Sequence, residues 1–223
     1  MRAWSERILG WIAPPRCPGC DAVTNAPWCA ECGPPEEPPS GVTVDDVPVI
    51  ALGVYGGALA RAIRRMKYEP CPALARALAR PLAERLAALQ VNDGTALVPV
   101  PLHPERLVER GFNQAALIGR ELARATSLPL RARALVRAKR TDRQAALKRA
   151  LRFENVMGAF ALRSAGLESV ILVDDVVTTG ATARACVAAL RAGNVAVAAI
   201  AALAVRPAGR APEFQADAEK SEI

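Results

Sequence analysis

Apolar and polar positions along the chain follow two different periods. Runs of β-branched and aliphatic residues bounded by polar or turn residues predict strands, at residues 47–55, 95–101, 168–174 and 195–205. Apolar residues at helical spacing predict helices, at residues 1–16, 58–68, 73–89, 112–126 and 179–192. Strands that alternate with helices predict an α/β fold with a mostly parallel, twisted sheet flanked by helices.

Changes in composition divide the chain into three parts. The segment GPPEEPPSG at 33–41 is rich in proline and acidic residues, which is typical of a linker. We therefore expect an N-terminal unit over residues 1–40, made of a helix, a cysteine cluster and this linker, and a main domain over 41–206. Residues 207–223 are polar, and a disordered tail is expected there.

Length and hydropathy limit the class of protein. The 223 residues suit one ordinary domain with a small extra module. The longest uninterrupted apolar run, 195–205, is far shorter than the about 20 residues that cross a bilayer. Glu6 and Arg7 interrupt the N-terminal apolar stretch, which makes it a poor signal peptide. We expect no membrane span and a cytoplasmic, reducing location, where cysteines are more often metal ligands than disulfides.

Four cysteines form two CxxC pairs near the N-terminus. CPGC and CAEC place Cys17, Cys20, Cys29 and Cys32 at the spacing C-x₂-C-x₈-C-x₂-C. Four thiolates suit tetrahedral zinc, and a site filled by four protein ligands has no open position for catalysis. The sequence therefore predicts a small four-cysteine module with a structural zinc ion, with an iron–sulfur centre or paired disulfides as alternatives.

Positive charge is concentrated in one segment. The chain carries 29 basic and 22 acidic residues, a net charge of +7. Between residues 131 and 152 nine basic residues stand against one acid, Asp142. Such a field attracts the phosphates of a nucleotide or a nucleic acid, although a solvated helix face is the alternative.

The stretch VILVDDVVTTGAT at 170–182 carries the most specific chemistry. A buried strand leads into Asp174 and Asp175, and the loop Thr178, Thr179, Gly180, Ala181 and Thr182 then enters a helix. Ligands of parallel sheets bind beyond the carboxyl ends of the strands, and a helix N-terminus with a glycine favours an anion. Carboxylates accept hydrogen bonds from a ribose diol and can help recruit Mg²⁺. The pattern therefore predicts a site for a sugar phosphate.

This stretch resembles the motif with which type I phosphoribosyltransferases bind phosphoribosyl pyrophosphate (PRPP). In that family two acids hold the ribose hydroxyls and the T-T-G-x-T loop holds the 5-phosphate. The chain is further identified as similar to the ComF family of competence-associated, phosphoribosyltransferase-like proteins. The similar pieces are the paired CxxC cluster, YGGALARAIRRMKY (55–68), VPVPLHPERLVERGFNQA (98–115), RAKRTDRQAALKRALRFENVMGAF (137–160) and the PRPP motif.

The resemblance assigns further parts. It implies that the turn around Leu102 and His103 lies on the pyrophosphate side, and that the basic segment is a mobile hood over the site. The candidate hood or nucleic-acid residues are Arg137, Lys139, Arg140, Thr141, Arg143, Gln144, Lys148 and Arg149. Stabilising a departing pyrophosphate needs cations rather than a general base, so no catalytic residue is assigned.

Three functions fit the resemblance. The first is a PRPP- or nucleotide-binding protein that acts in natural transformation and handles incoming single-stranded DNA. The second is an active Mg²⁺-dependent phosphoribosyltransferase with an unknown acceptor. The third is a scaffold whose zinc module recruits a DNA translocase or helicase. Trp4, Trp11 and Trp28 all lie in the N-terminal unit, and we expect them to pack this unit against the main domain rather than to form a stacking platform for single strands.

Overall fold

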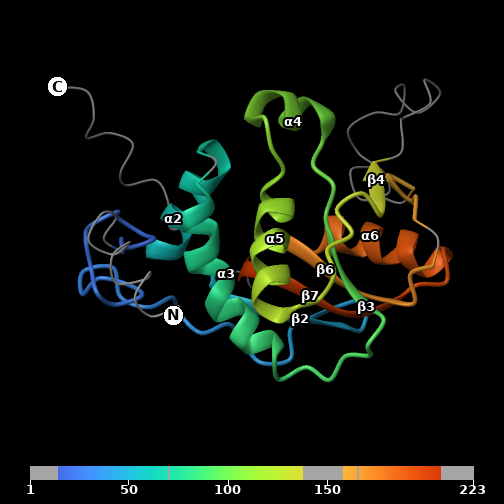
Figure 1. Cartoon of the computed structure of the whole chain (residues 1–223), viewed down its shortest axis with the longest axis horizontal. Helices are drawn as coiled ribbons and strands as arrows, with labels where there is room; N and C mark the ends of the chain where they lie inside the picture. The colour runs from blue at the N-terminus through green and yellow to red at the C-terminus, as the bar shows by residue number, and fades with distance from the viewer. Residues whose placement is uncertain (1–14, 70, 138–157, 165, 207–223) are drawn as a thin grey trace, which may run out of the picture.

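The computed structural model describes residues 15–69, 71–137, 158–164 and 166–206. Within these residues a five-stranded sheet has the order β1-β2-β7-β6-β3 (Figure 1). Its strands are β1 (Thr43–Val44), β2 (Val47–Val54), β7 (Ala196–Val205), β6 (Ser169–Val177) and β3 (Thr95–Pro99). Every neighbouring pair is parallel except the short β1–β2 hairpin. The predicted mostly parallel α/β sheet is confirmed.

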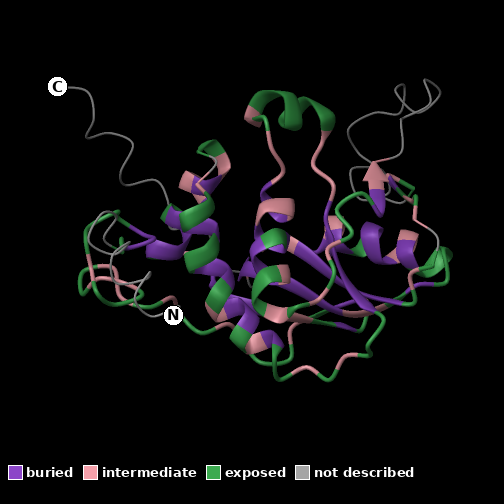
Figure 2. Cartoon of the chain, in the orientation of Figure 1, coloured by how far each residue is buried: buried purple, intermediate pink, exposed green. Residues whose placement is uncertain are grey.

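Helices cover both faces of the sheet. Helices α2 (Gly57–Tyr68), α3 (Pro72–Leu86) and α5 (Gln114–Thr126) supply side chains to the apolar core on one face. On the opposite face lie α6 (Ala181–Ala192) and a two-stranded sheet of β4 (Leu135–Arg137) and β5 (Phe160–Leu162). The strands are therefore buried on both sides, as the central location of the buried residues in Figure 2 shows, and this explains their nearly continuous apolar runs.

Alternate residues of β6 face the two cores. Ile171 and Val173 join the core under α2, α3 and α5, whereas Val170 and Leu172 join the core under α6. Because side chains alternate along a strand, the two acids that follow point to opposite faces of the sheet. The strand also continues to Val177, so Asp174 and Asp175 lie within it and not at its end as predicted from the sequence.

Helix α4 (Pro104–Arg110) was not predicted from the sequence. It buries none of its residues and projects away from the sheet at the top of Figures 1 and 2. Its ends carry recognisable signals: His103 caps it by accepting a hydrogen bond from the Glu105 backbone N–H, Pro104 begins it, and Gly111 ends it with a left-handed φ of 75°. A helix this short without a buried face gives no hydrophobic period to detect.

The proline-rich segment runs along the sheet. The carbonyl of Glu36 accepts a hydrogen bond of 2.9 Å from the Val54 backbone N–H, and Glu37 forms an ion pair of 2.6 Å with Arg85 of α3. A Cβ atom on Gly53 would lie 2.6 Å from the Cβ of Pro35, so this close approach requires glycine. No helix in the described parts of the chain combines the length and apolar character needed to traverse a bilayer.

Candidate functional site

The two acids of the motif lie where β6 extends beyond its neighbour β3. Pairing between β3 and β6 ends at Pro99 and Val173, with one further backbone bond of 2.8 Å from Val100 N–H to the Val173 carbonyl. Pairing of β6 with β7 continues as far as Val177. Asp174 and Asp175 therefore border an open edge of the sheet, and both line one cavity of about 220 Å³.

Asp175 forms an ion pair with Lys67. The Asp175 Oδ2 atom lies 2.9 Å from Nζ of Lys67, which stands in the last turn of α2, and both side chains are largely buried. The backbone carbonyl of Lys67 accepts a hydrogen bond of 3.2 Å from Nε2 of Gln114, a buried residue at the start of α5. Lys67 is thus held from two sides, and its ammonium group is placed at the cavity.

Asp174 is in a different environment. Its Oδ1 atom accepts a hydrogen bond of 2.8 Å from the Asp175 backbone N–H. Burial raises the pKa of Asp174 well above its usual range, and the neighbouring carboxylate of Asp175 raises it further. The two carboxyl groups therefore differ: Asp175 is paired with a cation, whereas desolvation raises the pKa of Asp174.

Four cationic side chains of the described residues line the cavity. Lys67 comes from α2, Arg106 and Arg110 from α4, and Arg137 from β4. Among the described residues, no acceptor lies within hydrogen-bonding distance of the buried Nε atoms of Arg110 and Arg137. Desolvation lowers the pKa of Arg137, whose guanidinium carbon lies 5.0 Å from the centre of the Phe160 ring. The cavity is therefore suited to an anionic ligand.

The loop after the acids separates two hollows. Thr182 lines the cavity with the acids, whereas Thr178, Thr179 and Gly180 line a neighbouring hollow of about 100 Å³. Gly180 adopts a left-handed φ of 73°, and a Cβ atom there would lie 3.0 Å from Cγ2 of Val44. The sharp entry into α6 therefore needs glycine. Ala181 follows as the first residue of α6, so the structure places the predicted loop at a helix N-terminus without gathering all its residues around one cavity.

Most of the predicted hood lies outside the described residues. Arg137 is described and lines the cavity, whereas the remaining candidates are not, namely Lys139, Arg140, Thr141, Arg143, Gln144, Lys148 and Arg149.

Several residues of the cavity were not predicted as site residues. Among them are four polar ones that fall within segments resembling the ComF family: Lys67, Arg106, Arg110 and Gln114. Two features of the sequence could have indicated these four residues. Lys67 follows the apolar positions of a predicted helix, and the two arginines and the glutamine lie close together in the stretch PERLVERGFNQ.

Similarity to known proteins settles the family. Competence protein F of Haemophilus influenzae is 32% identical over 184 residues, which cover 74% of this chain and 80% of that protein. The chain belongs to the ComF family. DNA utilization protein YhgH of Escherichia coli O157:H7 is 31% identical over 175 residues, 72% of this ComF-family chain and 76% of the relative.

Among solved structures, adenine phosphoribosyltransferase from Leishmania donovani is similar over 66% of this chain and 73% of its own, at 14% identity and a TM-score of 0.36. No model of a protein family matches the chain. The assignment to the ComF family rests on the alignment with competence protein F.

The four cysteines of this ComF-family chain lie together as the spacing predicts. The sulfur atoms of Cys17, Cys20, Cys29 and Cys32 all lie within 4.8 Å of one another. Tetrahedral zinc with sulfur ligands at about 2.3 Å separates these atoms by about 3.8 Å, close to the 3.5 Å between Cys20 and Cys29. The cluster therefore fits a tetrahedral metal ion.

The thiols of the cluster differ in acidity. Burial raises the pKa of Cys17, but hydrogen bonds from three backbone N–H groups of the cluster outweigh it and bring the pKa to about 6. Burial raises the pKa of Cys32 to about 12, although Arg61 opposes this shift. Binding of a metal to all four sulfurs would consequently release protons.

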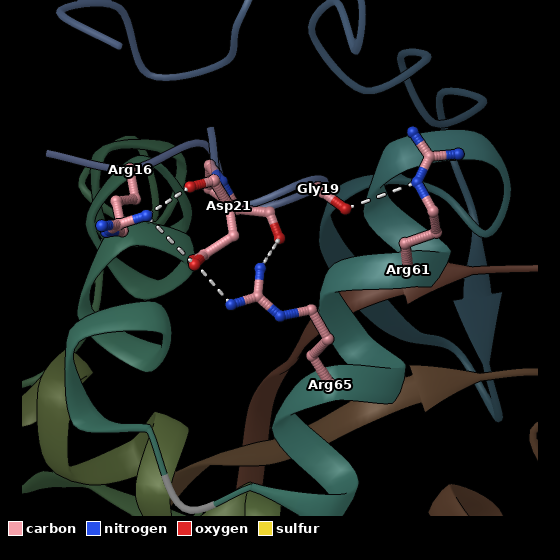
Figure 3. Close-up of polar contacts among 6 residues, drawn as sticks. Arg16, Gly19, Asp21, Arg61 and Arg65 are labelled. Atoms are coloured by element: carbon pink, nitrogen blue, oxygen red, sulfur yellow. Dashed lines mark hydrogen bonds and ion pairs between the residues drawn. The ribbon is translucent and has the colours of Figure 1, made fainter. Parts of the chain in front are cut away.

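Two arginines of α2 hold the cysteine module against the main domain (Figure 3). Arg61 donates from Nε to the Gly19 carbonyl at 3.4 Å, as Figure 3 shows. Its Nη2 atom also donates to Sγ of Cys32 at 3.4 Å. Arg65 donates to the Pro18 carbonyl at 3.3 Å and forms an ion pair of 2.7 Å with Asp21. These contacts use carbonyls, a sulfur atom and a carboxylate of the module. The guanidinium groups of both arginines therefore have hydrogen-bond acceptors within the protein.

The module also packs closely on α2. A Cβ atom on Gly19 would lie 2.8 Å from Cβ of Ala58 and 2.9 Å from Sγ of Cys32. Trp28 is half-buried and packs against the core under α2, α3 and α5, so for this residue the packing interpretation is confirmed. Trp4 and Trp11 lie outside the described residues.

Proposed function

We propose that this chain binds a 5-phosphorylated ribose, as PRPP or as a nucleotide 5-phosphate, in the cavity beside β6. The observation that carries the proposal is the cavity itself, in which two carboxylates of β6 and the Thr182 end of the T-T-G-A-T loop meet four cationic side chains. A sugar diol donates hydrogen bonds, which carboxylates accept, and phosphates need cations and backbone N–H groups.

The two acids would act on the sugar from different positions. Asp175 is already oriented by Lys67, so its remaining lone pairs are directed without further ordering. Asp174 is fixed by the backbone N–H of its neighbour. A phosphate group near Lys67 would share the ammonium group with Asp175, which links sugar and phosphate recognition in one contact.

Magnesium fits the same site as a cofactor of PRPP. Mg²⁺ prefers oxygen ligands and bridges phosphates to carboxylates, and Asp174 and Asp175 are the carboxylates that line the cavity. When bound, the ion would neutralise phosphate charge. Arg106, Arg110 and Arg137 would bind the same phosphates from the protein side. Such cations also favour departure of pyrophosphate, which supports an active phosphoribosyltransferase with an unidentified acceptor as the second candidate function.

The biological role we propose is DNA uptake in natural transformation. The relatives are called competence protein F and DNA utilization protein, and the excess of basic residues between 131 and 152 suits single-stranded DNA. We assign zinc to the cysteine cluster and propose that its role is structural. A cytoplasmic location is part of this proposal, because incoming strands are handled there.

The test compares ribose 5-phosphate with 2-deoxyribose 5-phosphate by thermal shift at matched concentrations. The two compounds differ in one hydroxyl, so a diol site predicts a larger rise in Tm with the ribose compound. Asp175→Asn should remove most of this difference. Equal shifts with both compounds would mean that the acids do not read the sugar.

A further inference from the structure

An exposed aromatic side chain that the proposed ligand does not use stands beside two residues of the cavity, Lys67 and Arg110, and we call this position the rim. Tyr68 is the last residue of α2 and is 70% exposed. Other exposed apolar residues of the described chain include Leu107 and Val108 in α4, the helix that supplies Arg106 and Arg110 to the cavity. An aromatic ring and apolar side chains thus stand beside a concentration of positive charge.

Tyr68 is held in place by its neighbours. The guanidinium carbon of Arg110 lies 5.8 Å from the centre of the Tyr68 ring. The same guanidinium donates from Nη1 to Oε1 of Gln114 at 3.3 Å, and Gln114 in turn donates to the carbonyl of Lys67. The ring, the guanidinium and the buried amide therefore form one connected unit, which fixes the end of α2 against α4 and α5. With Arg110 beside it and most of its surface in solvent, the ring can accept a second planar group.

An independent observation indicates that this unit meets an anion. Nε of Arg110 is buried, and no acceptor lies near it among the residues that the structure describes. Buried donors normally have a partner. Arg110 lines the cavity beside Arg106, so phosphate oxygens at the mouth would supply the missing acceptor while a base stacks on the ring.

We propose that Tyr68, backed by Arg110, is a stacking platform for a nucleobase of single-stranded DNA at the mouth of the cavity. The inference rests on the proposed function in DNA handling and adds the residue that contacts the bases. Base stacking on an aromatic residue beside a basic groove is the usual way of holding single strands without reading their sequence. Because Tyr68 is at the rim and is mostly exposed, it suits a strand that passes over the mouth rather than a base enclosed within the cavity.

The experiment measures fluorescence anisotropy of two labelled strands of about 16 nucleotides, one oligo(dA) and one abasic with the same phosphates. Tyr68→Ala should weaken oligo(dA) binding by about 5- to 100-fold and leave the abasic strand unchanged. Tyr68→Phe, which keeps the ring, should bind like the wild type. Val108→Ala is the matched control, because it removes an 86% exposed apolar side chain of α4 that has no aromatic face.

Equal weakening of both strands in Tyr68→Ala would overturn the inference, because it would indicate a structural role only. Unchanged oligo(dA) binding in this variant would overturn it too. Absence of oligo(dA) binding to the wild type would overturn it as well. Titration of the same proteins with ribose 5-phosphate separates this inference from the proposed function. Tyr68→Ala should retain ribose 5-phosphate binding. If the wild type binds oligo(dA) through Tyr68 but no sugar phosphate, the proposed sugar site fails and the platform stands.

Discussion

Helix α2 contacts two sites. They differ in how completely their polar groups find hydrogen-bond or ion-pair partners within the protein. Arg61 and Arg65 donate to carbonyls, a sulfur and a carboxylate of the cysteine module. At the end of the same helix, Lys67 has one carboxylate, whereas Arg110 and Arg137 keep buried Nε atoms without an acceptor among the described residues. Because buried polar groups are normally paired, the comparison separates a region built for structure from one built for a ligand.

The largest effect should come from breaking the structural region. Cys17→Ser removes one of four metal ligands, and structural zinc contributes about 10–16 kcal/mol of apparent binding energy in small zinc modules. We expect the variant to lose stoichiometric zinc, measured by elemental analysis after gel filtration. The sheet should still unfold cooperatively, because none of the buried residues of its two cores belongs to the module. Full zinc retention in Cys17→Ser would contradict a four-thiolate site.

A smaller effect should follow from loosening the contact between module and helix. Arg61→Ala removes the donor to Sγ of Cys32, and loss of such outer contacts weakens metal binding by about 10- to 100-fold. Competition with a zinc chelator measures the change. Arg80→Ala, at an 82% exposed position of α3 with only a 3.8 Å pair to Glu84, should have no effect. Equal behaviour of the two variants would show that the module does not depend on α2.

The smallest of these effects concerns the stability that the folded protein loses by holding Asp174 in the ligand region. The pKa of Asp174 is raised in the folded protein, so the folded state binds more protons between the unfolded pKa of about 3.9 and the raised value, and stability falls as pH rises through this window. Asp174→Asn cannot titrate and keeps the Oδ1 acceptor. We expect it to be more stable than the wild type at pH 7, by about 2–4 °C in Tm for each kcal/mol relieved, with an advantage that shrinks in acid.

The control for this prediction is Asp175→Asn. It loses the ion pair with Lys67 but also relieves Asp174 of a neighbouring negative charge. Because the two effects oppose each other, its Tm at pH 7 should stay within the equivalent of about 1 kcal/mol of the wild type. If Asp174→Asn were instead destabilised at every pH, the Asp174 carboxyl would be a structural group rather than a ligand-binding one.

The same contrast explains what could be predicted from the sequence. Cys17 to Cys32 and Asp174 to Thr182 are each contiguous stretches, so their spacing alone places the ligands of a metal and the parts of an anion loop. The parallel sheet was predicted because strands alternate with helices along the chain. Lys67, Arg106 and Arg110 come from other helices and reach the cavity only through tertiary packing, which hydrophobic periodicity does not encode.

Two local features could in principle have been predicted from the sequence. The His103-Pro104 start and Gly111 end of α4 carry capping chemistry. The acids of β6 were placed at the end of the predicted strand because its apolar run leads directly into them. The structure shows that pairing with β7 carries the strand past them, although pairing with β3 on the other side has already ended.

The most direct test of the account is calorimetric titration of PRPP with Mg²⁺ into the wild type and into the double variant Asp174→Asn/Asp175→Asn. We predict saturable binding to the wild type and a loss of more than about 100-fold in the variant, because both carboxyl groups that would hold the sugar hydroxyls are replaced by amides. Equal binding to both proteins, or no binding to the wild type, would contradict a ribose-phosphate site beside β6.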